Sequence, residues 1–82
     1  MRAIRLGRES LALQKRSLTL SDGRRTSVAL EPAFWDVLEK IALLRRKTIT
    51  ALVSDVDRHR SDHAALTSAL RVYALQHRPN EF

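Results

Sequence analysis

The chain has no cysteine among its 82 residues, and only two glycines and two prolines. Without cysteine it forms no disulfide bond, no cysteine-bound zinc site and no thiol nucleophile. With so few glycines it has neither a glycine-rich phosphate-binding loop nor the Gly-x-Ser-x-Gly turn that carries the nucleophile of many hydrolases. We therefore expect a protein that is not an enzyme and that holds no cofactor and no metal.

Long apolar runs are also missing. No segment approaches the ~18–20 apolar residues that a membrane-spanning helix needs, and no apolar core follows the early arginines as a secretory signal requires. We therefore expect a cytoplasmic chain without a membrane partner. A single domain of this length buries only around 60–65% of its extended surface, and such domains often gain stability by forming oligomers.

Acidic residues are scarce in the N-terminal part. Residues 1–30 hold seven basic and two acidic side chains, residues 31–82 hold eight and seven, and the whole chain has a net charge of +6. An excess of cations in one segment is typical of a surface that meets a polyanion such as nucleic acid. The alternative is that this charge only serves solubility.

The clearest turn signal is Ser21-Asp22-Gly23, which predicts a hairpin between strands at about 15–20 and 24–30. A two-residue loop would mix apolar and polar side chains on each face of the sheet. A three-residue loop with a left-handed Gly23 pairs Leu18 with Thr26 and Arg16 with Val28. We favour the three-residue loop, because it places Leu18, Leu20, Thr26, Val28 and Leu30 on one face.

Three amphipathic segments follow, at about 32–46, 48–59 and 64–77. Pro32 suits the first turn of a helix, Thr48 is a candidate N-cap, and Pro79 ends the last segment. Trp35 is expected in a core or at a dimer contact. Each segment has a stripe of residues expected to be buried. In the first segment the stripe is Phe34, Leu38, Ile41 and Ala42, widened by Trp35, Val37 and Leu44. In the second it is Ile49, Leu52, Val53 and Val56, and in the third it is Leu66, Ala69, Leu70 and Tyr73, widened by Val72 and Leu75.

Residues 1–13 show no clean periodicity and carry three arginines, so we expect a basic flexible arm before a domain at 14–82. His59 and His63 have the i, i+4 spacing of a metal pair, but a polar junction between two helices explains the segment more simply. The expected architecture is mostly α with a small β part.

The segment RTSVALEPAFWDVLEKIA, followed by Thr48-Ile49-Thr50, resembles the ribbon-helix-helix domain of the MetJ/Arc superfamily over residues 24–58. The longer pattern, from KRSLTL to LTSALRVYAL, resembles a bacterial subgroup with an extra N-terminal strand and a third helix. The resemblance implies a homodimer that pairs its strands into a ribbon and binds double-stranded DNA. Its function would be that of a transcriptional regulator or an antitoxin-type autorepressor.

The resemblance also implies roles for particular residues. Base edges in the major groove would be read by Arg25, Ser27 and Ala29. A phosphate would be held by Thr48, Ile49 and Thr50 at the start of a helix. The excess of basic residues in the N-terminal part, rather than the resemblance, predicts further phosphate contacts by Arg2, Arg5, Arg8 and Arg24. The apolar residues expected in the dimer core, because one small chain has too little interior for them, are Val28, Leu30, Phe34, Leu38, Leu52 and Val53.

Two features leave an alternative open. Ala29 can offer at most a contact to a thymine methyl group, and the extra strand would widen the paired ribbon from two strands to four. The major groove is ~12 Å wide and strands lie ~4.8 Å apart. The alternative is a protein-interaction or assembly module, or an antitoxin, that keeps the dimer scaffold, binds a protein partner and has no specific DNA readout.

Overall fold

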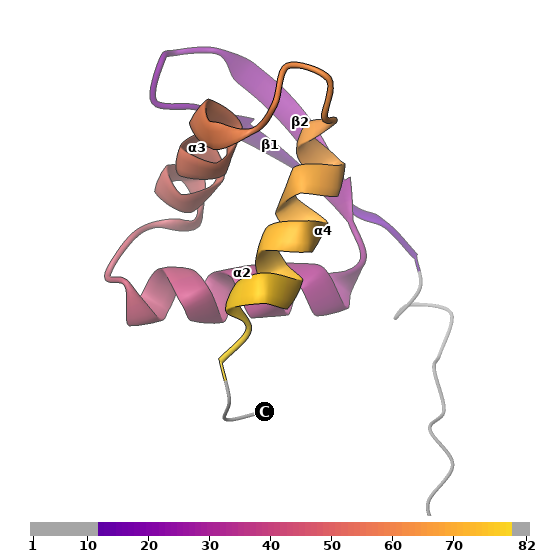
Figure 1. The fold of residues 1–82 in the computed structure, drawn as a ribbon, viewed down its shortest axis with the longest axis vertical. Helices are drawn as coiled ribbons and strands as arrows, with labels where there is room; N and C mark the ends of the chain where they lie inside the picture. Colours follow the sequence, from indigo (N-terminus) through magenta and orange to yellow (C-terminus); the bar gives the residue numbers. More distant parts are fainter. Residues whose placement is uncertain (1–11, 80–82) are drawn as a thin grey trace, which may run out of the picture.

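The computed structural model describes residues 12–79, which form a two-stranded antiparallel hairpin followed by three helices (Figure 1). The hairpin consists of β1 (Gln14–Thr19) and β2 (Arg25–Leu30), and the helices are α2 (Pro32–Leu44), α3 (Ile49–His59) and α4 (Leu66–His77). The predicted order of two strands and three helices is confirmed. The predicted arm lies outside the described residues except for Ala12 and Leu13, which are exposed.

The hairpin turn is a three-residue loop, as the sequence predicts. The N–H of Leu20 donates to the carbonyl oxygen of Arg24 at 2.8 Å, and the N–H of Gly23 donates to the carbonyl oxygen of Leu20 at 2.9 Å. Gly23 has a φ of +92°, in the left-handed region that favours glycine. These bonds describe a turn followed by a glycine bulge, a common hairpin connection.

This loop sets the register of the two strands. Leu18 lies opposite Thr26 and Arg16 opposite Val28, which confirms the predicted pairing. Apolar side chains of both strands therefore lie on one face of the hairpin. The three helices cover this inner face, and α4 packs against both other helices and β2 (Figure 1).

The first two helices begin at the residues that the sequence signals. Glu31 is extended, with ψ at 146°, and Pro32 is the first residue of α2. Thr48 is the N-cap of α3, and its Oγ1 accepts a hydrogen bond from the N–H of Ala51 at 3.0 Å. The prediction that Thr48 caps this helix is confirmed.

Helix α2 ends two residues before the predicted end at 46. Arg46 has a φ of +57°, which takes the backbone out of the helix. The N–H of Lys47 donates to the carbonyl oxygen of Ala42 at 2.8 Å, and the N–H of Arg46 donates to that of Leu43 at 3.1 Å. This is the Schellman motif. The sequence did not signal it, because glycine usually occupies the position of Arg46. At the other end of the chain, α4 begins at Leu66, two residues after the predicted start.

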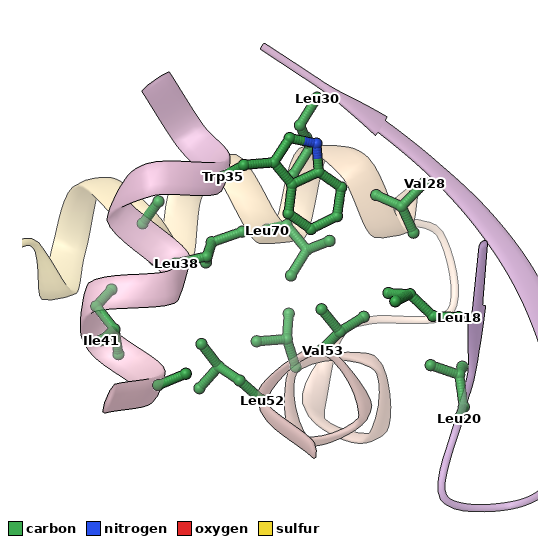
Figure 2. Close-up of a cluster of buried hydrophobic side chains, with 13 residues drawn as sticks. Leu18, Leu20, Val28, Leu30, Trp35, Leu38, Ile41, Leu52, Val53 and Leu70 are labelled. Carbon is green, nitrogen blue, oxygen red and sulfur yellow. The ribbon is translucent and has the colours of Figure 1, made fainter. Parts of the chain in front are cut away.

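The hydrophobic core lies between the inner face of the hairpin and the three helices (Figure 2). Trp35 is fully buried in this core, and its Nε1–H donates to the carbonyl oxygen of Gln14 at 2.9 Å. The guanidinium of Arg16 lies 4.4 Å from the centroid of the Trp35 ring and pairs with Glu39 at 2.6 Å. Arg16 therefore closes the core at the edge of the hairpin. The buried apolar residues are Leu18, Leu20, Val28, Leu30, Trp35, Leu38, Ile41, Ala42, Leu52, Val53, Val56, Leu70 and Ala74.

The reason given for a shared dimer core is wrong. Val28, Leu30, Leu38, Leu52 and Val53 were assigned to a dimer core, yet all five are buried within one chain. Phe34, the sixth residue of that set, is partly buried and packs against the same core. The third helix supplies the missing cover, since Leu70 and Ala74 of α4 belong to this core. One chain is therefore large enough to bury these residues.

Three apolar residues that were expected to widen buried stripes are exposed instead. Leu44 is at the end of α2, where the chain leaves the helix, and Val72 and Leu75 lie on the side of α4 away from Leu70 and Ala74. Helices α2 and α4 therefore bury narrower stripes than the sequence pattern suggested, whereas α3 buries Leu52, Val53 and Val56 as expected. Among the helices of residues 12–79, none is both long and apolar enough to cross a membrane.

Candidate nucleic-acid interface

The hairpin presents one face away from the helices, which we call the outer hairpin face. Side chains of a strand alternate between the two sides of the sheet, so this face takes every second residue of each strand. From β2 it includes the three predicted base-contact residues, which lie opposite three residues of β1. The outer hairpin face consists of Arg25, Ser27 and Ala29, paired with Thr19, Ser17 and Lys15.

The three residues of β1 on this face were not among the residues predicted to contact DNA. Lys15, Ser17 and Thr19 are exposed, as are Arg25 and Ser27 opposite them. The register of the three-residue loop already implied their position, because it fixes which residues of β1 share a face with β2. The structure therefore places the three predicted base-contact residues on one face of the hairpin, together with the three residues of β1 that lie opposite them.

The outer hairpin face is basic. Arg25 and Lys15 are exposed and form no hydrogen bond or ion pair with any residue in 12–79. The other four residues of this face are uncharged. Because this face carries cations and hydroxyl groups but no carboxylates, none of its side chains would repel a polyanion that approaches it. Arg25 can offer its planar donor fork to a base edge or a phosphate.

Arg24 is held differently from its neighbour. Its Nε donates to Oδ2 of Asp22 at 2.7 Å, and its Nη2 donates to Oδ2 of Asp57 in α3. The hydrogen bond with Asp22, and then that with Asp57, raises the pKa of Arg24. Hydrogen bonds from the backbone N–H and then the side chain of Arg24 lower the pKa of Asp22. Arg24 thus fastens the hairpin turn to α3, and its predicted phosphate contact would require it to leave both carboxylates.

The predicted phosphate clamp lies at the start of α3. The N–H groups of Ile49 and Thr50 belong to the first turn of the helix, where they have no partner within the helix. The hydroxyl of Thr48 is already used as the cap. The partial positive charge at a helix N-terminus attracts anions, so the local geometry is compatible with the predicted role.

The clamp and the predicted base-contact residues do not meet within one chain. Figure 1 shows α3 running from the end of α2 towards the hairpin turn, and the second half of α3 contacts this turn through Ser54 and Asp57. The first turn of α3 therefore lies at the end away from the hairpin turn, whereas Arg25 directly follows that turn. The predicted phosphate contacts Arg2, Arg5 and Arg8 lie outside the described residues.

The comparisons with known proteins agree with this architecture. A family model described as a ribbon-helix-helix domain matches residues 13–78. Among solved structures, an uncharacterized protein from Bordetella pertussis Tohama I is similar, with 38% sequence identity and a TM-score of 0.70. The match covers 88% of this chain and 60% of that one, so the present chain spans less than two thirds of its neighbour. No curated protein matches.

Proposed function

Because this chain belongs to the ribbon-helix-helix family, we propose that it is a homodimeric DNA-binding protein of the bacterial cytoplasm that regulates transcription. Domains of this family are commonly scaffolds of DNA-binding regulators or antitoxins rather than enzymes. The observation that carries the proposal is the outer hairpin face, where Arg25 and Lys15 lie among small hydroxyl side chains without a carboxylate. This face is where a β-ribbon of the family meets the major groove.

The free edge of β2 offers the contact through which two chains would pair. Within the described residues β2 has only β1 as a neighbour. In an antiparallel ladder, residue pairs that exchange backbone hydrogen bonds alternate with pairs that do not. Leu20 and Arg24 form a hydrogen-bonded pair, so the first residue of β2 and every second residue after it have no backbone hydrogen bond to β1. Arg25, Ser27 and Ala29 therefore direct their backbone groups to the free edge of β2. Pairing of two such edges would give a sheet in the order β1-β2-β2-β1.

The width of this sheet suggests how it would dock. Three strand spacings span roughly 14 Å, more than the ~12 Å of the major groove. The two central β2 strands would enter the groove, and the two β1 strands would lie along the phosphate backbones. Arg25 and Ser27 would then read base edges, Ala29 would contact a thymine methyl, and Lys15 would contact phosphate. Further phosphates would be met by Arg2, Arg5, Arg8, Arg24 and the amides at Thr48, Ile49 and Thr50.

An assembly module without specific readout is the second candidate, and exposed Leu43 and Leu44 at the end of α2 favour it. A partner protein could cover these side chains. The compact packing of α4 against α2, α3 and β2 speaks against an antitoxin with a free toxin-binding tail. A regulator in which α4 is part of the domain fits this packing better.

Selection of binding sites from random duplex DNA, followed by substitution, tests the proposal. We expect a consensus, and we expect Arg25→Ala to cost about 1–3 kcal/mol at the preferred site and to flatten discrimination at one position. Lys40→Ala is the matched control, since Lys40 is an exposed cation on α2 and not on the outer hairpin face. Absence of a consensus, or equal effects of the two substitutions, would favour the assembly module.

A further inference from the structure

A groove of about 710 Å³ lies between the second half of α3 and the outer side of α4, away from the outer hairpin face. Helix α4 buries Leu70 and Ala74 on one side. Its residues Ala69, Val72 and Tyr73, three and four positions apart, line the groove on the other. None of the residues of the outer hairpin face lines this groove, so DNA binding by that face would leave it open.

The floor of the groove is apolar. Val56 of α3 lies opposite Ala69, Val72 and Tyr73 of α4, and Ala64 closes the end near the connection of the two helices. Val72 is 52% exposed, although it is a large apolar residue. An occupant with an apolar body would remove this surface from water, which is the main source of binding free energy in such sites.

The rim of the groove is cationic. Arg45, Lys47, Arg58 and Arg60 line it, together with a single carboxylate, that of Asp55. Lys47 and Arg58 both pair with this carboxylate, and Arg60 pairs with Asp57, which does not line the groove. The four cations therefore outnumber the two carboxylates that they contact. The rim is therefore complementary to an anion.

Two side chains join the cationic rim to the apolar floor. The guanidinium of Arg45 lies 5.5 Å from the centroid of the Tyr73 ring and donates to the Tyr73 hydroxyl. This contact holds a positive charge beside the Tyr73 ring at the groove. Nη2 of Arg45 also lies 3.3 Å from Nδ1 of His77. An arginine has five N–H donors, so Arg45 keeps donors for a ligand even with both contacts in place.

We propose that this groove binds a small amphipathic anion, with a carboxylate, sulfonate or phosphate on an apolar or aromatic body. The volume lies within the range of roughly 300–1,000 Å³ that is usual for small-molecule sites. The charge of the rim argues against two other occupants. Residues 1–11 carry Arg2, Arg5 and Arg8 against Glu9 alone, and a second copy of the chain would bring the same cations to the rim.

The probe for the test is 8-anilinonaphthalene-1-sulfonate, whose fluorescence rises in apolar surroundings, added to the full chain. We expect saturable binding of one probe per chain. Octanoate should displace the probe, whereas octylammonium, with the same alkyl length and the opposite charge, should not. This experiment needs no DNA, so its outcome is independent of the proposed function.

Two substitutions at the groove, each with a matched control, locate the site. Arg45→Gln should lower the affinity for the probe by about tenfold, because a charged hydrogen bond is lost. Lys40→Gln removes the same charge outside the groove and should leave the affinity unchanged. Val72→Asp should lower the affinity for the probe by a similar factor. Leu75→Asp changes the same helix outside the groove lining and should not lower it. Chemical shifts of Ala69 and Tyr73 on probe addition give a second reading that needs no variant.

Unchanged binding in both groove variants, or unchanged shifts of Ala69 and Tyr73, would overturn the proposal. Equal displacement by octylammonium would also overturn it, because the groove would then be an apolar patch without preference for anions. The proposal would also be overturned if the protein bound anionic vesicles while free octanoate did not displace the probe, because the groove would then be a membrane-binding surface.

Discussion

The hydroxyl of Ser54 in α3 accepts a hydrogen bond from the backbone N–H of Ser21 in the hairpin turn, at 3.0 Å. Ser54 is 2% exposed and is the buried polar side chain of the part of the chain that the structure describes. A serine inside a helix usually faces solvent or the preceding turn. Here it ties the hairpin to α3, thirty-three residues away.

We predict that Ser54→Ala destabilises the protein by about 1 kcal/mol, because the N–H of Ser21 loses its partner. The cost stays at the lower end of the usual range because Ser21 is exposed, and water can reach its amide. Urea unfolding followed by circular dichroism measures this difference. Ser68→Ala, at an exposed position of α4, should change stability by less than about 0.5 kcal/mol. Equal effects of the two substitutions would contradict the role of Ser54.

Arg46→Gly should stabilise the chain by about 0.5–1 kcal/mol. Arg46 adopts a φ of +57°, which costs free energy for any residue with a Cβ atom, and glycine avoids this cost. Arg45 has a φ of −92°, so Arg45→Gly should instead destabilise the protein. Urea unfolding of both variants is the measurement, and shifts of the same sign would show that the backbone at Arg46 is not strained.

Acid should weaken the link between the hairpin turn and α3. Hydrogen bonds from Arg60 and then Arg24 hold the pKa of Asp57 below the usual Asp value of 3.8. A carboxylate whose pKa is lowered by folding contributes stability above its unfolded pKa, and loses it as the pH falls through the lower folded value. Stability from this link should therefore be constant from pH 5 to 7 and fall below about pH 4.

Thermal unfolding between pH 3 and 7 tests this. Asp57→Asn should reduce stability at pH 7 and flatten the decline below pH 4. Asp36→Asn, at an exposed position of α2, serves as the matched substitution. If the stability of Asp57→Asn and that of the parent chain fall in parallel below pH 4, the acid sensitivity has another source.

Dimerisation through the free edge of β2 should be sensitive to proline. Ser27→Pro removes an N–H that points away from β1, so it should leave the hairpin intact and yield a monomer in light scattering. Ser17→Pro, at the paired position of β1, removes an N–H from the outer edge of the hairpin and should leave the dimer in place. A parent chain that is monomeric at micromolar concentration, or equal dissociation by both prolines, would rule out this interface.

The N-terminal segment should act on all DNA sequences alike. If the dimer engages ~6–10 phosphates, its affinity should fall ~10³–10⁵-fold between 50 and 200 mM salt. Deletion of residues 1–13 removes Arg2, Arg5 and Arg8. It should weaken binding to every duplex and make the affinity depend less steeply on salt concentration. A shortened chain with unchanged affinity and salt dependence would show that these arginines do not contact DNA.

Local signals in the sequence were sufficient for the elements and the hairpin. Gly23 could take the left-handed conformation, the alternation of Leu18, Leu20, Val28 and Leu30 required one register, and Pro32 and Thr48 marked the starts of two helices. These features depend on neighbours in the chain and on the repeat of a strand or helix, so they can be inferred without the fold. The end of α2 was not predictable, because Arg46 carries no signal for a positive φ.

Tertiary packing decided what the apolar residues do and what the cations contact. Val28, Leu30 and Leu52 are buried in one chain because α4 lies across the hairpin and α3, and no periodicity within α4 could show where it packs. Arg24 and Arg25 are neighbours of equal charge, yet Asp57, thirty-three residues after Arg24, pairs with Arg24, while Arg25 is left exposed on the outer hairpin face. Burial and ion pairing both depend on residues far apart in the chain, so the sequence determines which groups are available and the fold determines which of them meet.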